Sequence, residues 1–453
     1  MTTPVGPHAG ATTEGVTSRL ARLAARGTLF SLAGRGVIEG LRFASNLLLT
    51  RLLAPEAFGL MAIANAVSQG TRMMTDLGVR GSVVQHARGD DPTFLNTAWT
   101  IQILRGAVVA VTLCAGAGFV AEAFAKPEAT MLIRAVALCA LIDGFQSTAG
   151  HTLLRKIRVG RQALRDVTAK AIGIAVMLAW ALAIPSVWAL VAGAIAGSLA
   201  QLWFSHRLIP GYSNRLAYDK PSARSIARFG RWVLVASLMT FVLQQGDRLA
   251  LGKLMTATEL GVYAIALGLT QTIPELLQAM SVNILFPVYA RLGKLEIKEQ
   301  RREVERYRFV ILAIALPGLW ALTWLGQDIV HFLYDARYTS AGWMVQLLAA
   351  SLVPVALTST AERALMARGD SFSHMLVQTS QAALVLGGLL LGYLALGDTR
   401  GVLLGLVLGR WLGYVPLAFF LRRIGLWLPR LDGIALLVSA LVIAGALHWR
   451  GAP

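Results

Sequence analysis

Apolar residues along the chain gather into long runs that polar segments separate. A membrane-spanning helix needs about 20 predominantly apolar residues. Twelve runs meet or approach that length, at 29–50, 58–76, 97–118, 129–149, 167–185, 186–205, 229–251, 260–284, 307–325, 342–361, 374–396 and 401–421. A weaker thirteenth run covers 431–449. The pattern predicts an all-α protein that crosses a membrane many times.

The composition agrees with this interpretation. Of the 453 residues, 56% are hydrophobic and only 15% are charged, and the mean hydropathy is +0.60. Soluble domains are less apolar and more charged. The first 24 residues lack an apolar core of signal-peptide length, so 1–24 is predicted to be a disordered cytoplasmic tail. Cys114 and Cys139 fall inside apolar runs, and no metal-ligand spacing is found, so the sequence predicts neither a cofactor nor a metal.

Basic residues are concentrated in alternate loops. The segments after the fourth, sixth and eighth runs hold six, six and seven Lys or Arg residues. Five of the other loops hold one each, namely Arg51, Lys126, Lys253, Arg337 and Arg400. Cytoplasmic loops carry the Lys and Arg excess in membrane proteins. The net charge of +18 therefore indicates topology, with a cytoplasmic N-terminus, rather than binding to nucleic acid.

Two stretches of the chain echo each other 202 positions apart. "RLLAPEAFGLMAIA" begins at Arg51, and "KLMTATELGVYAIA" begins at Lys253. Because six spans separate the copies, both have the same orientation, which predicts two parallel six-helix lobes. The predicted lobes cover 25–205 and 229–425, with a cytoplasmic linker at 206–228. In transporters with parallel repeats, the substrate path lies between the lobes, so a central cavity is predicted.

The same segments carry a resemblance to a known family. "LLTRLLAPEAFGLMAIA" with "TDLGVRGSVVQ", and "FGRWVLVASLMTFVLQQGDRLALGKL" with "ELGVYAIALGL" and "SVNILFPVYARL", resemble the polysaccharide transporter family of the multidrug/oligosaccharidyl-lipid/polysaccharide exporter superfamily. The resemblance covers 25–425. It implies a multi-pass flippase in the bacterial inner membrane. The expected substrate is an undecaprenyl-diphosphate-linked oligosaccharide for exopolysaccharide or lipopolysaccharide synthesis.

The resemblance has further implications for mechanism and partners. It implies alternating access by a monomeric transport unit, with glycan polymerases or glycosyltransferases as partners. The thirteenth run, 431–449, departs from the family, in which an even number of spans is common. This difference leaves the topology of the C-terminal segment undecided, but it does not affect the prediction of a two-lobe core.

Charged residues within the first apolar run are the main candidates for function. In "SLAGRGVIEGLRFASN", Arg35, Glu39 and Arg42 lie at i, i+4 and i+7, on one helical face. A charge at this depth is costly and is a functional hypothesis by default. Arginine binds phosphate oxygens bidentately, so Arg35 and Arg42 are candidate diphosphate ligands, with Glu39 as their partner or an ion site. The alternative is a structural ion-pair ladder. The flippase branch for a lipid-linked peptidoglycan precursor also uses first-helix arginines, and this likeness favours the functional reading.

The seventh and eighth runs supply the other candidates. Arg248 is a further candidate for the diphosphate, and Asp247 and Glu275 are candidate ion or coupling sites. Structural hydrogen bonding or ion pairing is the alternative for each. Polar amides are predicted to line the cavity, namely Gln69, Gln244, Gln271 and Gln278. Weaker candidates are Asp143, Gln146, Gln378, Gln381 and Arg410.

Two rival functions stay open at this stage. A cation-coupled multidrug exporter of the same superfamily would need an acidic cavity, whereas the inner charge here leans to arginine. A membrane glycan polymerase or ligase would need a long outer loop with catalytic charge. The longest outer loop predicted, 326–341, carries no Ser/His/Asp set or carboxylate pair, so no enzymatic activity is predicted. The energy source, whether membrane potential, Na⁺ or H⁺, is left open.

Overall fold

The structure, a computed structural model, describes residues 13–155, 160–281, 285, 289, 292, 296–368 and 370–449. Within these ranges the chain forms helices and no strand. The elements are α1 (Thr13–Leu52), α2 (Pro55–Met74), α3 (Val79–Gln85), α4 (Pro92–Ala123), α5 (Ala129–Gly144), α6 (Ala149–Arg155), α7 (Gly160–Ala183), α8 (Trp188–Ser205), α9 (Lys220–Leu254), α10 (Ala257–Met280), α12 (Ile297–Leu333), η2 (Ala336–Tyr338), α13 (Ala341–Ala361), α14 (Arg363–Ala367), α15 (Ser371–Leu396), α16 (Thr399–Leu412), α17 (Tyr414–Arg423) and α18 (Pro429–Trp449).

Each of the predicted apolar runs overlaps a helix of the structure, which confirms the all-α polytopic membrane fold. In the described part of the chain, nine helices are long and apolar enough to cross a membrane, or ten if the bent pair α5 and α6 forms one span. The helices α1, α2 and α9 are not among them. Charged side chains such as Arg35, Glu39 and Arg42 make α1 less apolar than the others.

Several helix ends differ from the predicted boundaries. The helix α1 begins at Thr13, inside the segment 1–24 that was predicted to be disordered. The helix α9 begins at Lys220, so the predicted linker 206–228 ends early, where Asp219 caps the helix by accepting a hydrogen bond from the Ser222 N–H. The helix α12 continues to Leu333, which shortens the predicted outer loop. Amphipathic and charged helical turns extend beyond the apolar run that a membrane requires, so hydropathy underestimates helix length.

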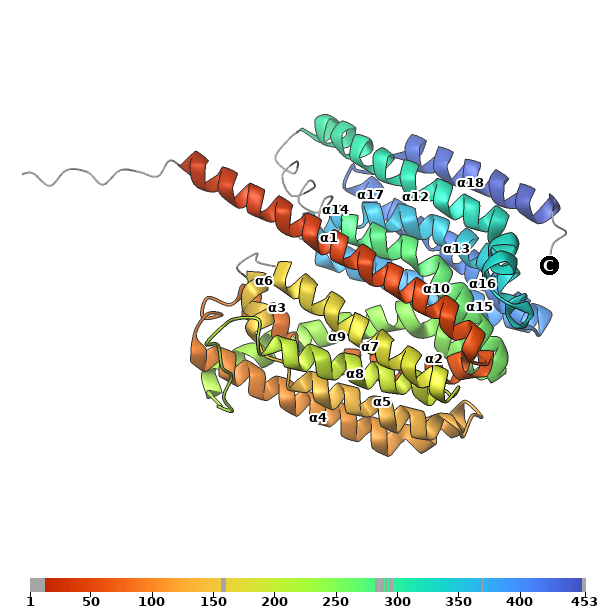
Figure 1. The fold of residues 1–453 in the computed structure, drawn as a ribbon. Coiled ribbons are helices and arrows are strands. Elements are labelled where there is room, and N and C mark those ends of the chain that lie inside the picture. The colour runs from red at the N-terminus through yellow and green to blue at the C-terminus, as the bar shows by residue number, and fades with distance from the viewer. Residues whose placement is uncertain are drawn as a thin grey trace, which may run out of the picture.

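The helices pair in the same way in two halves of the chain. In the first half, α4 packs on α5, α5 on α2 and α8, and α7 on α8 and α1. In the second half, α12 packs on α13, α13 on α10 and α16, and α15 on α16 and α9. The two sets lie one above the other in Figure 1, with α1, α9 and α10 near their boundary. We call them the N-lobe (α1 to α8) and the C-lobe (α9 to α17), and their matching pairings support the predicted parallel repeat.

The echoed stretches lie at the starts of α2 and α10, where the lobes touch. A Cβ atom added to Gly59 would overlap the carbonyl oxygen of Ala257, and one added to Gly261 would overlap the carbonyl oxygen of Pro55. The two helices therefore cross with their backbones in direct contact, which only glycine allows. We call this region, together with the ends of α1 and α9 beside it, the closed end of the molecule.

A basic side chain from the N-lobe reinforces the closed end. Lys126, in the loop between α4 and α5, donates hydrogen bonds to the carbonyl oxygens of Gly252 (2.8 Å) and Met255 (2.9 Å) at the end of α9. A cation at a helix C-terminus compensates the exposed carbonyls. Burial lowers the pKa of this ammonium group. The contact joins the N-lobe to the C-lobe.

The C-lobe makes the matching contact in return. Arg337 donates to the Thr50 carbonyl oxygen (2.8 Å) and Tyr338 donates to the Leu53 carbonyl oxygen (3.3 Å) at the end of α1. Thr50 and Leu53 lie 202 positions before the two acceptors of Lys126, which is the repeat register. We call the two sets of hydrogen bonds the reciprocal clasps. Lys126 and Arg337, the lone basic residues of their loops, thus have a structural role that their spacing alone did not indicate.

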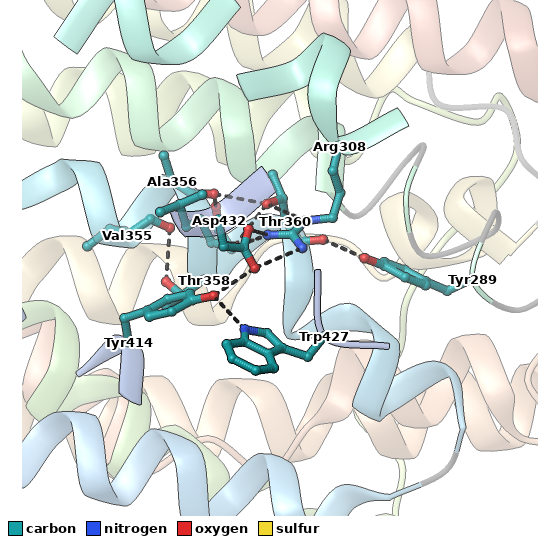
Figure 2. A network of polar contacts seen from close by, with 11 residues as sticks. Tyr289, Arg308, Val355, Ala356, Thr358, Thr360, Tyr414, Trp427 and Asp432 are labelled. Atoms are coloured by element: carbon teal, nitrogen blue, oxygen red, sulfur yellow. Dashed lines mark hydrogen bonds and ion pairs between the residues drawn. The ribbon is translucent and has the colours of Figure 1, made fainter. Parts of the chain in front are cut away.

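The thirteenth predicted run forms α18, which packs on α12 and α13 of the C-lobe. Figure 2 shows its anchor: Arg308 of α12 donates to Asp432 of α18 at 2.7 Å, and both side chains are only 1% exposed. The Tyr414 hydroxyl donates to the same carboxylate at 2.7 Å, and the Trp427 indole N–H donates to the Tyr414 oxygen. Buried charges are tolerated when they are paired and fully hydrogen-bonded. The helix α18 is therefore an integral part of the C-lobe.

Candidate functional site

A large cavity lies between the two lobes. Its volume is about 1680 Å³, which exceeds the roughly 300–1,000 Å³ of sites for drug-sized ligands. Helices α1, α2, α7 and α8 line one side, and α9, α10, α13, α14, α15 and α16 line the other. Leu49, Phe58 and Leu260 mark the part nearest the closed end. The cavity confirms that the repeat encloses a central space.

The α1 arginines reach this cavity. Arg35 and Arg42 both line it, as the i, i+7 spacing predicted. Glu39 forms an ion pair with Arg42, and Arg42 also donates to Glu275 of α10 at 3.3 Å. The structure thus shows Glu39 paired with Arg42 rather than shared between both arginines. The Arg42–Glu275 ion pair connects the N-lobe with the C-lobe within the cavity.

Lys170 is a third basic group on the N-lobe side. It lines the cavity from α7, which packs on α1. In the sequence Lys170 is the last of the six basic residues counted after the fourth run, although the predicted fifth run, 167–185, already includes it. In the structure α7 begins at Gly160, so Lys170 lies three turns inside the helix. The sequence signal for this depth is the position of Lys170 inside the predicted run 167–185.

The seventh span contributes Arg248, which lines the cavity as predicted. Its guanidinium donates to the Gln245 side-chain oxygen at 3.0 Å. Gln245 lines the cavity too, although the sequence analysis named its neighbour Gln244. The side chains of Gln244 and Asp247 lie outside the described part of the structure, so the hypotheses about them stay predictions.

The predicted polar residues of α10 also line the cavity, namely Gln271, Glu275 and Gln278. Gln69 of α2 lies in a smaller adjoining pocket, which Gln245 and Arg248 share with it. Among the weaker candidates, Gln378, Gln381 and Arg410 line the main cavity. Asp143 instead forms an ion pair with Arg72 inside the N-lobe.

One group of cavity residues was not predicted from the sequence. Glu362 and Arg363 lie where α13 gives way to α14, and His374 lies near the start of α15. In the sequence Glu362 and Arg363 fall between the tenth and eleventh runs, and His374 is the first residue of the eleventh run, so none of them was singled out. The structure folds this segment as a short helix against α15, which brings the three side chains to the cavity surface.

The charges of the cavity are unevenly distributed. Among the described lining residues, six are basic and two are acidic. The N-lobe supplies Arg35, Arg42 and Lys170 and no lining carboxylate, whereas the C-lobe supplies Arg248, Arg363 and Arg410 together with Glu275 and Glu362. A cavity of this sign attracts anions and disfavours cations. In the described part of the chain, no cluster of His, Cys, Asp and Glu could hold a metal ion.

Comparison with known sequences identifies the family. The profile of a family described as polysaccharide biosynthesis protein matches residues 48–343, which include the closed end and most of the N-lobe. The chain belongs to this family.

Two relatives cover much of the chain. The succinoglycan biosynthesis transport protein ExoT of Rhizobium meliloti is 22% identical over 335 residues. The match spans 73% of this chain and 66% of ExoT, just under two thirds of that protein. The lipopolysaccharide biosynthesis protein WzxC of Escherichia coli is 21% identical over 422 residues, which are 89% of this chain and 84% of WzxC.

Solved structures share the fold. The lipid II flippase MurJ, in an inward closed conformation, superposes with a TM-score of 0.67 over 93% of this chain and 92% of its own, at 13% identity. An inward-facing multidrug resistance MATE transporter superposes with a TM-score of 0.64 over 92% and 98%, also at 13% identity. At this identity the likeness establishes the two-lobe membrane fold and does not distinguish between substrates.

Proposed function

We propose that this protein is a flippase that moves an undecaprenyl-diphosphate-linked oligosaccharide across the bacterial inner membrane. The observation that carries the proposal is the basic cavity between the lobes, with six basic and two acidic lining residues. A diphosphate is the anionic part of such a lipid, and arginine and lysine are its natural ligands. The family match and the names of ExoT, WzxC and MurJ support the same substrate class.

The closed end would face the periplasm. The loops that meet there contain the lone basic residues Arg51, Lys126, Lys253 and Arg337, and the loops at the opposite end carry the Lys and Arg excess of cytoplasmic segments. The N-terminus is therefore cytoplasmic in this proposal, and the structure corresponds to a state closed toward the outside. Transport then requires separation of the lobes at the closed end and their approach at the opposite end.

Within this cycle, Arg42 and Lys170 would hold the diphosphate, and Arg35 and Arg248 are further basic groups that line the same cavity. Glu275 forms an ion pair with Arg42 in the structure, so an arriving diphosphate would compete with the Glu275 carboxylate for the Arg42 guanidinium. The membrane potential can drive the step. About two negative charges that leave a negative interior gain roughly 4–5 kcal/mol per 100 mV over the whole field.

The test is deletion of the gene in its own host. Surface glycan should disappear, because the later steps outside lack their substrate. Undecaprenyl-diphosphate-linked glycan should accumulate in the cytoplasmic leaflet, because it is no longer transported. A plasmid copy of the protein should reverse both effects. Susceptibility to cationic drugs is measured in the same strains as a test of the multidrug exporter alternative, and it should not change. Unaltered surface glycan together with increased drug sensitivity would contradict the proposal and favour the multidrug exporter.

A further inference from the structure

One corner of the cavity differs from the rest because it combines acidic, basic and amide groups. Glu362 separates α13 from α14, and its side chain faces α15. Around it lie Arg363, His374 and Gln378, and all four residues line the cavity. We call these four residues the C-lobe corner. Nothing in the proposed binding of the diphosphate uses them.

The contacts within the corner are long. The Gln378 amide donates to a Glu362 carboxylate oxygen at 3.3 Å. The Arg363 guanidinium lies 3.7 Å and the His374 Nε2 atom 3.9 Å from the Glu362 carboxylate oxygens, which is beyond hydrogen-bond distance. Glu362 is nevertheless 9% exposed, so it is largely removed from solvent. The carboxylate keeps capacity for further donors.

Two nitrogen atoms of the corner have no hydrogen-bond partner in the described structure. They are Arg363 Nε and His374 Nε2, and both are buried. Buried polar atoms are nearly always hydrogen-bonded, so each such exception needs an explanation. Both atoms belong to side chains on the cavity surface, where a bound molecule could supply the missing partner.

The chemistry of the corner selects among candidate ligands. A phosphate is an acceptor only and would be repelled by the Glu362 carboxylate, while a cation would be repelled by Arg363. A hydroxyl group can donate to the carboxylate and accept from a guanidinium or imidazole N–H at the same time. Adjacent hydroxyls on one ring therefore match this set of groups.

We propose that the C-lobe corner binds hydroxyl groups of the sugar units nearest the diphosphate, while the N-lobe arginines and Lys170 hold the diphosphate itself. This inference rests on the proposed function and assigns the two walls of the cavity to two parts of one substrate. The corner then recognises that a glycan is attached, and the basic wall recognises the lipid diphosphate that all such substrates share.

The test compares two lipids on the purified protein in nanodiscs. The probes are undecaprenyl diphosphate without sugar and undecaprenyl diphosphate linked to one glucose or one galactose. The affinity of each is measured for the wild type, Glu362→Leu, Glu362→Gln and Gln378→Leu. The control is Ser380→Ala, because Ser380 lies on α15 beside Gln378 but its hydroxyl is bonded to the Leu376 carbonyl and does not line the cavity.

We expect the wild type to bind a sugar-bearing lipid about tenfold more tightly than the bare lipid, the effect of one or two hydrogen bonds to charged groups. Glu362→Leu and Gln378→Leu should abolish this preference and leave the affinity for the bare lipid unchanged. Glu362→Gln should retain part of it, because an amide oxygen still accepts from a hydroxyl. Ser380→Ala should behave as the wild type does.

The possible failures are distinguishable. Equal affinity of the wild type for bare and sugar-bearing lipids would overturn the sugar subsite and leave the flippase proposal standing. If Gln378→Leu and Glu362→Gln both keep the wild-type preference for the sugar-bearing lipid, the sugar subsite is also refuted. These two variants test the subsite even if Glu362→Leu does not fold. Absence of binding to every one of these lipids would contradict the proposed function itself.

Discussion

The two lobes share one set of helix pairings but present different surfaces to the cavity. The N-lobe wall carries Arg35, Arg42 and Lys170 without a lining carboxylate, and the C-lobe wall mixes three basic residues with two acidic ones and several amides. The C-lobe also has α18, which no helix of the N-lobe matches. A repeated fold therefore does not imply repeated chemistry. The backbone pairings set the shape of the cavity, and in our proposal the side chains of the two lobes bind different parts of the substrate.

The largest effect should come from removal of the N-lobe basic groups. Arg42→Ala together with Lys170→Ala should reduce surface glycan by about 100-fold or more per inserted protein, since each of the two lost charge-assisted bonds is worth about 1.5–3 kcal/mol. Arg42→Lys should restore export only in part, because an ammonium cannot reproduce the guanidinium fork. Arg400→Ala is the control, because Arg400 lies in the first turn of α16 and does not line the cavity. Wild-type export by the double variant would show that the basic wall is structural.

A second prediction concerns the anchor of α18. Asp432→Leu or Arg308→Met alone leaves one buried charge unpaired and should lower the free energy of unfolding by about 3–5 kcal/mol, whereas the double variant should recover most of the loss. Thermal unfolding in detergent, followed by tryptophan fluorescence, measures this.

The N-lobe offers a matched ion pair for this experiment. Arg72 and Asp143 are 29% and 26% exposed, so removal of either partner should cost less than removal of Arg308 or Asp432. Equal losses in the two lobes would refute the claim that burial of the Arg308–Asp432 pair is what makes α18 an integral part of the C-lobe.

The smallest effect is expected at the reciprocal clasps. Lys126→Met and Arg337→Met each remove side-chain hydrogen bonds between the lobes, and each should increase the population opened at the closed end only a few-fold. Distances between spin labels at positions 128 and 400, in a protein with Cys114 and Cys139 replaced, report that population. If only one of the two variants shifts the distance distribution, the clasps are not equivalent.

The sequence was sufficient to predict the helices and the repeat. Long apolar runs leave few alternatives to membrane helices, and the echo at Gly59 and Gly261 predicted the parallel lobes. The spacing of Arg35 and Arg42 also placed both on the cavity side. These features depend on local periodicity, which one sequence displays directly.

The C-lobe corner and Lys170 could not be predicted in the same way. Glu362 and His374 come together because α13 breaks and α14 folds against α15, which is a tertiary event without a hydropathy signal. Lys170 lies near the start of the predicted run 167–185 and was counted with the basic residues before it, yet α7 begins ten residues before Lys170 and carries it to the cavity. The clasps were missed because a lone loop cation gives no indication of which carbonyl it will reach.

The glycine crossing has a consequence for how the chain can vary. Gly59 meets Ala257 and Gly261 meets Pro55, and these partners are themselves 202 positions apart, so the contact has the reciprocity of a two-fold dimer interface within a single polypeptide. Unlike the two copies in a homodimer, Gly59 and Gly261 can be substituted independently, but each lies against the backbone of the helix that carries the other. The same close contact between backbones restricts both positions, and each accepts a larger residue only if the opposite helix moves away. The closed end thereby preserves a trace of two equal halves in a protein whose cavity walls have otherwise diverged.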